Sequence, residues 1–209
     1  CLSRGLGDVY KRQVSIYMSL VLKPEIDPNN ASMLTLITAM AVAGGIEKTT
    51  GLECKIKWPN DIVVHGKKVC GILTEMSTQM DYINYIVIGI GINVQNESFP
   101  EEIREVATSL RIESGKKQKR AAIIEAVWEE FEKYYDIYLK TEDMQGLVGE
   151  YDQKLANMNK QVRVLDPKDP YEGTARGITP KGELIVDTWE ARKLVSSGEV
   201  SVRGLYGYV

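Results

Sequence analysis

Residues suited to binding an anionic, phosphorylated ligand follow one another closely in one stretch of this 209-residue chain. Asn60 and Asp61 come directly after Pro59, and Lys68 and Gly71 follow in the next strand-like segment. An ammonium group binds phosphate oxygens, a carboxylate accepts a proton or helps to hold magnesium, and a glycine lets a ligand approach the backbone. If these residues lie on neighbouring strands, we expect their side chains to surround one site.

Three short strands are expected to position these side chains, over residues 55–58, 62–64 and 67–76. Pro59 ends the first strand because it has no N–H to donate to a ladder. His65 and Gly66 then fit a two-residue hairpin, since glycine tolerates the positive φ of a type I′ turn. His65, the one histidine of the chain, lies at this hairpin tip and is not expected to take part in catalysis.

Lys68 is the candidate for a fixed cation at the site. Strand alternation places Lys67 and Lys68 on opposite faces, so only one of the two shares a face with Cys70. A lysine is a poor base unless its pKa is strongly lowered, so we expect Lys68 to offset negative charge that develops on phosphorus. Asp61 could accept a proton from an attacking amine or position a magnesium ion.

Two asparagines and a tryptophan are further candidates. Asn60 and Asn93 each follow a strand and a rigid element, and either carboxamide could hold phosphate oxygens or a magnesium-bound water. The alternative is that both asparagines only form turns, which is common at strand ends. Trp58 is interpreted as a wall of the site or of the core rather than as a stacking platform.

Residues 85–94 predict a strongly apolar strand, which we expect to be central and buried on both faces. Gly89 and Gly91 interrupt it, and each costs roughly 0.5–1 kcal/mol relative to alanine. The strand therefore needs room at these positions. The pattern is not a dinucleotide-binding fingerprint, because a third glycine is missing and no helix follows directly.

The composition is that of an ordinary globular chain, with 44% apolar and 26% charged residues. A net charge of −3 gives no electrostatic case for nucleic acid, and the basic run 116–120 is interpreted as a solvated surface. Three cysteines without metal-binding spacing fit a reducing cytoplasm. We recognise no signal peptide and no apolar run that reaches the length of a membrane span.

The remaining pattern predicts an α+β fold in which helices pack on a mixed β-sheet. A strand is expected over 14–22, followed by a helix that Asn29 or Asn30 caps and that extends to about Thr49. Gly44-Gly45 in this helix would allow tight packing on a sheet. Further helices are expected over 100–106, 118–140 and 143–158, and short strands over 161–166, 171–178, 183–187 and 200–203.

Three parts of the chain follow from these elements. Residues 1–13 lack periodicity and join the first strand abruptly, so they are interpreted as a foreign leader. Residues 14–158 form the main domain. Residues 159–209 form a small β-barrel, since turn signals recur there every eight to twelve residues or so.

Three motifs in this order resemble the catalytic domain of the biotin–protein ligases. They are Lys57-Trp58-Pro59-Asn60-Asp61, then Lys68 with Gly71-Ile72-Leu73 and Glu75, then Gly89-Ile90-Gly91-Ile92-Asn93. Residues 198–203 resemble part of the C-terminal SH3-like domain of that family. The resemblance covers about residues 14–209 and implies a biotin/lipoate ligase-like catalytic fold followed by an SH3-like barrel.

The resemblance implies an ATP- and Mg²⁺-dependent ligase with biotin as substrate. Biotin and ATP would form biotinyl-5′-AMP, and biotin would then pass to a lysine of a biotin carboxyl carrier protein domain of the acetyl-CoA carboxylase type. Lys68 and Asp61 are the implied catalytic residues. Those implied to bind ATP or biotinyl-AMP are Asn60, Lys68, Asn93 and Trp58, with magnesium at Asn60 and Asn93. Those implied to line the biotin pocket are Gly71, Ile72, Gly89 and Gly91.

The chain departs from the family pattern before its first strand. Biotin–protein ligases carry there a Gly/Arg-rich loop that closes over the adenylate, and polar residues that bind the ureido ring. Neither is recognised here, and the similarity of Ser3-Arg4-Gly5 to the Gly/Arg-rich loop is interpreted as a coincidence. We therefore expect a fragment with impaired activity, from a longer cytoplasmic protein. Nucleic acid would be a partner only if a missing N-terminal domain binds DNA.

Two other functions are consistent with the motifs. A lipoate–protein ligase or octanoyltransferase resembles this fold and also uses a lysine, although the KWPND motif and the barrel favour biotin. A non-catalytic module of the repressor type would bind biotinyl-AMP without transferring biotin. The sequence leaves a homodimer open and predicts no membrane partner.

Overall fold

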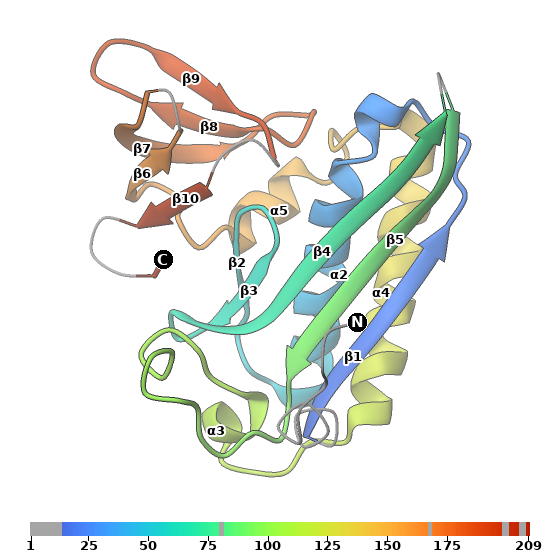
Figure 1. Ribbon diagram of the computed structural model, residues 1–209, viewed down its shortest axis with the longest axis vertical. Helices are drawn as coiled ribbons and strands as arrows, with labels where there is room; N and C mark the ends of the chain where they lie inside the picture. Colours follow the sequence, from blue (N-terminus) through green and yellow to red (C-terminus); the bar gives the residue numbers. More distant parts are fainter. Residues whose placement is uncertain (1–13, 80–81, 167–168, 198–200, 205–207) are drawn as a thin grey trace.

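The computed structural model describes residues 14–79, 82–166, 169–197, 201–204 and 208–209. Five strands form the sheet of its larger domain, in the order β1-β5-β4-β3-β2 (Figure 1). Their bounds are β1 Ser15–Leu22, β2 Lys55–Lys57, β3 Asp61–Val64, β4 Lys67–Gln79 and β5 Tyr82–Asn93. Every ladder between these strands is antiparallel, so the described part of the sheet is not mixed as expected. Parallel pairing is confined there to two isolated bridges.

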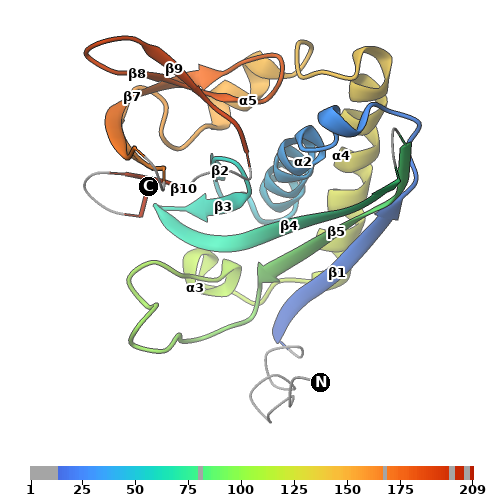
Figure 2. The ribbon, with the colours of Figure 1, turned by 45° about the horizontal axis from the view of Figure 1, so that its top comes forward.

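Two long helices, α2 (Met33–Thr50) and α4 (Arg120–Thr141), cover one face of this sheet (Figure 2). They approach each other closely at Gly45, where a Cβ would lie 2.7 Å from Cγ2 of Val127. The glycine therefore permits helix-to-helix packing, whereas the sequence suggested packing of the helix on a sheet.

The core helix of the domain is α2. Asp27, and neither of the expected asparagines, acts as a cap: it accepts the backbone N–H of Asn29 and begins a 3-10 turn, η1 (Pro28–Asn30), that precedes α2. Contrary to expectation, residues 28–50 are long and apolar enough to cross a membrane by length and composition. In the fold 72% of the most apolar window is buried, since α2 packs against both α4 and the sheet. Core packing therefore accounts for its hydrophobicity.

Only one face of β5 is buried. The side chains that point toward the helices are Ile86, Ile88, Ile90 and Ile92. On the outer face, Gly89 and Gly91 lie among residues of neighbouring strands that remain exposed, such as Tyr17 at 58% and Leu73 at 63%. The expectation of burial on both faces is therefore wrong for the described residues.

A small β domain follows the larger one, with five antiparallel strands in the order β10-β6-β7-β8-β9. Their bounds are β6 Gln161–Leu165, β7 Tyr171–Ile178, β8 Leu184–Asp187, β9 Arg192–Val195 and β10 Ser201–Gly204. All except β9 agree with predicted strands. The sequence of β9 begins with two basic residues and buries only Val195, so its alternation is weak.

Two short helices differ from the prediction. Residues 101–106 form turns in place of the expected helix, and α3 (Leu110–Ser114), capped by the hydroxyl of Ser109, forms where no helix was predicted. The helix predicted over 143–158 is only α5 (Val148–Lys154). Met144 and Leu147, both buried, lie in the turn before it.

Candidate functional site

A row of directly paired residues crosses all five strands of the larger sheet. In order across the sheet, these residues are Tyr17, Gly91, Gly71, Asp61 and Lys57. Directly paired residues present their side chains on the same face. Tyr17 thus lies at one end of the row, and Asp61 and Lys57 lie at the other. The two glycines between them have no side chains and leave a hollow on the outer face.

A groove of about 570 Å³ lies over this hollow. Its walls come from β1, β4 and β5 and include Tyr17, Ser19, Lys68, Gly71, Gly89 and Gly91. A Cβ on Gly89 would find only the backbone oxygen of Leu73 within 4 Å, at 3.7 Å. The space above Gly89 is therefore not filled by the described part of the chain. The volume is within the usual range of small-molecule sites, about 300–1,000 Å³.

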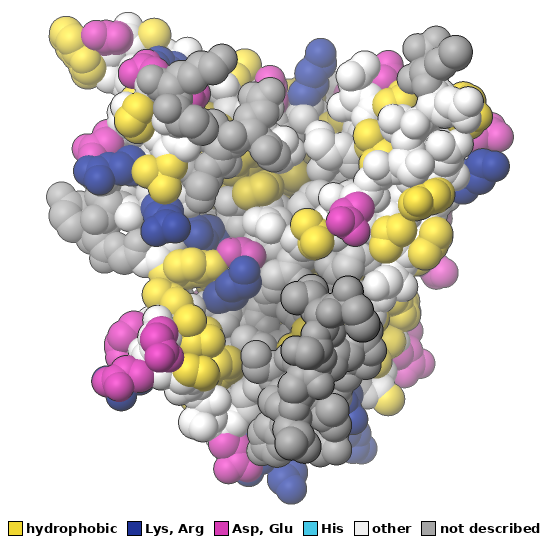
Figure 3. Space-filling model, in the orientation of Figure 1, with side chains coloured by type: hydrophobic (Ala, Val, Ile, Leu, Met, Phe, Trp, Pro, Cys, Tyr) yellow, Lys and Arg dark blue, Asp and Glu magenta, His cyan; other side chains and the backbone are white. Residues whose placement is uncertain are grey.

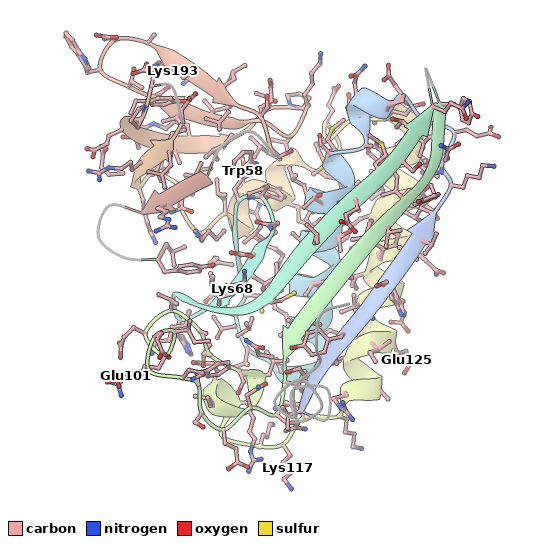
Figure 4. All side chains as sticks on the ribbon, in the orientation of Figure 1. Trp58, Lys68, Glu101, Lys117, Glu125 and Lys193 are labelled. Carbon is pink, nitrogen blue, oxygen red and sulfur yellow. The ribbon has the colours of Figure 1, made fainter. Side chains whose placement is uncertain are left out.

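An ion pair between Lys68 and Asp61 lies at the end of this groove. The Nζ of Lys68 is 2.5 Å from Oδ1 of Asp61, and a Cβ on Gly71 would be 3.0 Å from the same Nζ. Gly71 therefore gives the lysine side chain its space. The side chain of Lys68 is 37% exposed and that of Asp61 is 11% exposed, so a ligand reaches the lysine first. Figure 4 shows Lys68 near the bend of β4.

A β-bulge brings Lys68 to this face. Val63 of β3 pairs with Lys68, but the residue before it pairs with Cys70, which leaves Val69 as an extra residue in β4. Simple alternation would place Lys68 beside Cys70, a core residue that is 1% exposed. Because of the bulge Lys68 lies beside Gly71 instead, and the alternation assumed from the sequence does not hold here.

Tyr208, which comes after β10 of the small β domain, contacts the same carboxylate. Its hydroxyl donates a hydrogen bond to Oδ2 of Asp61, and the Nζ of Lys57 lies 3.8 Å from the centroid of its ring. Burial, followed by the hydrogen bond to Asp61, raises the pKa of Tyr208 above its ordinary value, so the phenol remains a donor. Nothing in the sequence could have joined Tyr208 to Asp61, because the contact spans two domains.

Lys57 and Lys68 flank Asp61, and the charge of Arg203 also acts on Lys57. Burial lowers the pKa of Lys57, and the nearby charges of Lys68 and Arg203 lower it further, while Asp61 opposes them. Figure 3 shows Lys and Arg side chains gathered where the small β domain meets the sheet, with acidic groups beside them. The site therefore presents an excess of positive charge in a partly buried setting, which favours phosphate and carboxylate ligands.

Asn60 and Asn93 do not converge on one point. Asn60 donates from Nδ2 to the backbone oxygen of Ile72 at 2.9 Å, which fixes it against β4. Asn93 donates from Nδ2 to the backbone oxygen of Thr108 at 3.1 Å, beyond the far edge of the groove. With strands about 4.8 Å apart and a rise of about 3.3 Å per residue, the two backbones are roughly 14 Å apart. One bound ion cannot contact both side chains at that separation.

Trp58 separates the larger sheet from the small β domain. Its indole Nε1 donates to the backbone oxygen of Gly182 at 3.1 Å, and the residue is 3% exposed (Figure 4). A second cavity of about 600 Å³ lies beside it, also lined by Asn60, Ile72 and Val202. The interpretation of Trp58 as a wall agrees with this geometry. Ile72, also 3% exposed, borders both the cavity and the groove.

The described residues do not form a ready metal centre. Within them, no group of three or more His, Cys, Asp and Glu side chains could hold an ion. His65 lies at the hairpin tip, as expected, and its Nδ1 lies 2.5 Å from Oε2 of Glu113.

Two family models match the chain. Residues 5–93 match the model described as Biotin/lipoate A/B protein ligase family, and residues 158–203 match Biotin protein ligase C terminal domain. The first match contains the whole row of paired residues and the glycines of the groove. It begins inside segment 1–13, which lies outside the described residues, so the interpretation of that segment as foreign stays a prediction.

Relatives with known names are similar over most of the chain. Bifunctional ligase/repressor BirA of Bacillus spizizenii is 38% identical over 189 residues, 90% of this chain and 58% of that protein. Biotin--[acetyl-CoA-carboxylase] ligase of Mycobacterium tuberculosis is 30% identical over 171 residues, 80% of this chain and 61% of that protein. The chain thus spans less than two thirds of either relative.

A solved structure has the same fold. Biotin protein ligase from Aquifex aeolicus in complex with biotin and ATP superposes with a TM-score of 0.80 at 28% identity, over 91% of this chain and 79% of that one. The small β domain is accordingly of the SH3-like type.

Proposed function

Because this chain belongs to the biotin protein ligase family, we propose that it catalyses the ATP-dependent ligation of biotin to a lysine of a carrier domain. The observation that carries the proposal is the Lys68–Asp61 ion pair at the end of a groove lined by three glycines. The groove has room for a small apolar ring system, and the ion pair supplies a cation and a base at one end of it.

Lys68 acts in the first half-reaction. A carboxylate oxygen of biotin attacks the α-phosphorus of ATP, the bond from that phosphorus to the bridging oxygen breaks, and pyrophosphate leaves with the bonding electrons. The product is biotinyl-5′-AMP. Negative charge that grows on the phosphoryl oxygens is offset by the ammonium of Lys68. To do so Lys68 turns from Asp61 to the ligand, which its exposure permits.

Asp61 acts in the second half-reaction. The amine nitrogen of the carrier lysine attacks the carbonyl carbon of biotinyl-5′-AMP, and AMP leaves with the electrons of the broken C–O bond. The proton that the amine loses passes to Oδ1 of Asp61, which is available once Lys68 has turned to the ligand. Lys57 and Arg203 assist, since their charges disfavour a protonated amine nearby.

The remaining candidates bind substrate in this proposal. Biotin packs over Gly71, Gly89 and Gly91, with Ile72 at the border of the groove. Asn60 and Asn93 contact different parts of the nucleotide, because they are too far apart to bind the same phosphate. Trp58 acts as a wall between the nucleotide and the SH3-like domain, since its indole N–H is already engaged.

Magnesium enters as part of the Mg-ATP substrate rather than as a resident ion. Both oxygens of Asp61 are engaged, and the described residues offer no acidic cluster. Magnesium bound to a triphosphate keeps several waters and needs few protein ligands. The Oδ1 of Asn60 or of Asn93 could supply one such ligand, but not both to the same ion.

The protein substrate is inferred from the relatives. The Mycobacterium tuberculosis protein is named for acetyl-CoA carboxylase, so we take a biotin carrier domain of such a carboxylase, in the cytoplasm, as the acceptor. The Bacillus spizizenii relative is also named a repressor. A DNA partner is a hypothesis that rests on that name alone, and a homodimer stays a prediction.

The test is biotin transfer to a purified apo carrier domain with Mg-ATP, comparing the chain with Lys68→Ala and Lys67→Ala. Lys67 is a matched control, because it is the adjacent lysine on the same strand and its Nζ donates to the exposed backbone oxygen of Arg104 at 3.3 Å. We expect a reduced level of transfer by the chain, in line with the impaired activity predicted from its sequence, the same level by Lys67→Ala, and a further loss of at least about a hundredfold in Lys68→Ala.

Three results would contradict the proposal in different ways. Transfer of lipoate in place of biotin would favour a lipoate ligase. Tight binding of biotinyl-5′-AMP without any transfer would favour a binding module. Equal loss in Lys67→Ala and Lys68→Ala would show that the ion pair has no special role.

A further inference from the structure

We propose that Tyr208 is a positioning residue for the transfer step, holding Asp61 so that Oδ1 of its carboxylate faces Lys68 and the groove. The inference rests on the proposed function, in which Asp61 accepts the proton of the attacking amine. It adds to that function a contribution from the SH3-like side of the molecule, whereas the other reacting groups come from the sheet.

The two oxygens of Asp61 have separate partners. Oδ1 lies 2.5 Å from the Nζ of Lys68 and 3.5 Å from the position of a Cβ on Gly71, so it faces these two residues of the groove. Oδ2 accepts the hydrogen bond from the hydroxyl of Tyr208. Because Asp61 is 8% exposed, water has little access to either oxygen, and these partners determine the orientation of the carboxylate.

The ring of Tyr208 is itself held in place. The Nζ of Lys57 lies 3.8 Å from the ring centroid, which is a favourable cation–π distance. Lys57 pairs directly with Asp61 in the sheet. Lys57 therefore supports the ring of Tyr208, and the hydroxyl of this tyrosine binds Asp61. Tyr208 is therefore a fixed donor rather than a chance contact of an exposed side chain.

The importance of Tyr208 changes between the two half-reactions. During adenylate formation Lys68 is the group in use, and the orientation of Asp61 matters less. Once Lys68 has turned to the adenylate, Asp61 keeps only the hydrogen bond from Tyr208 among the contacts described above. Loss of that bond lets the carboxylate rotate just when Oδ1 must meet the amine, so the transfer step depends on it more strongly.

The variant Tyr208→Phe removes the hydroxyl and keeps the ring over Lys57. Tyr171→Phe is a matched control, since Tyr171 belongs to the same SH3-like domain and has the Nζ of Lys193 4.0 Å above its ring. Two single-turnover rates are measured for each protein: formation of biotinyl-5′-AMP from biotin and Mg-ATP, and transfer from added biotinyl-5′-AMP to the apo carrier domain.

In Tyr208→Phe we expect the ratio of the transfer rate to the adenylation rate to fall about tenfold, through kcat, with the KM for the carrier domain unchanged. Tyr171→Phe should keep the wild-type ratio. A purely structural role would lower both rates together and would appear as a fall in Tm. An unchanged ratio, or a change only in the KM for the carrier, would overturn the inference.

Crystal structures of the chain and of Tyr208→Phe give a second readout that needs no activity. We expect the Asp61 carboxylate to rotate in the variant and the Lys68 contact to lengthen. If the chain formed no biotinyl-5′-AMP at all, the proposed function would fail, and these structures would still decide the positioning role. An unchanged Asp61 in Tyr208→Phe would refute that role.

Discussion

The substitution Gly89→Ala distinguishes two possible reasons for the glycine: the fold needs the space above it, or a ligand does. The new Cβ would lie 3.7 Å from the backbone oxygen of Leu73, an ordinary contact, with no other neighbour within 4 Å. Glycine within a strand costs roughly 0.5–1 kcal/mol relative to alanine, so Gly89→Ala should be more stable by about that amount. For a chain of this length the gain corresponds to a rise in Tm of about 1–4 °C.

The same methyl group would reduce the room in the groove. If biotin packs over Gly89, crowding of this kind costs about 1–3 kcal/mol, which raises the Kd for biotin roughly five- to 150-fold. Thermal unfolding without ligand gives the first quantity, and isothermal titration calorimetry with biotin gives the second. The variant should therefore unfold at a higher temperature and bind biotin more weakly.

Gly149→Ala is the control for this pair of effects. Gly149 lies in α5, a Cβ there meets nothing within 4 Å, and the residue does not line the groove. Its substitution should raise the Tm by a similar amount and leave biotin binding unchanged. The reasoning is refuted if Gly89→Ala lowers the Tm, or if it binds biotin as tightly as Gly149→Ala does.

Three further predictions concern the core and the domain junction. Gly45→Ala should lower the free energy of unfolding by about 1–3 kcal/mol in urea, because its Cβ would be 2.7 Å from Val127, and an unchanged value would contradict the close helix contact. Cys54 and Cys70 should resist iodoacetamide in the folded protein near pH 8, because burial raises the pKa of Cys54 to about 12 and that of Cys70 further; rapid alkylation detected by mass spectrometry would show that they are accessible. Burial raises the pKa of Asp152, so its stabilising contribution is present below the ordinary value of 3.8 and is lost as pH rises through the higher folded value. Urea unfolding between about pH 4 and pH 7 should show a shallower fall in Asp152→Asn, and an unchanged slope would assign the pH dependence to other groups.

Elements with a strong local pattern could be predicted from the sequence. The face of a strand on which a given side chain lies could not always be predicted. The hairpin at His65 and Gly66 has positive φ at both residues, as the turn chemistry requires. Lys68 on the adjoining strand could not be placed by alternation, because Val69 is an extra residue in the ladder. A bulge depends on how two strands pair, and this pairing leaves no clear trace in the residue types of one strand.

Contacts between domains could not be predicted from the sequence for a similar reason. The candidate site could be predicted as far as Asp61, Lys68 and Gly71, because these residues lie on adjacent strands of one sheet. Tyr208 reaches Asp61 from the other domain, and no spacing rule relates two residues so far apart in the chain. The small β domain itself could be predicted because its turns recur regularly, although β9 lacked a clear alternation.

The bulge at Val69 makes the position of Lys68 depend on chain length rather than on residue identity. Deleting one of residues 65–67 and closing the bulge would pair Lys68 with Val64 and turn the ammonium toward the apolar interior, even if every remaining side chain were kept. Substitutions at the exposed hairpin tip change no register and should be tolerated. For this hairpin an insertion or deletion of a single codon is therefore a more severe mutation than most amino-acid replacements.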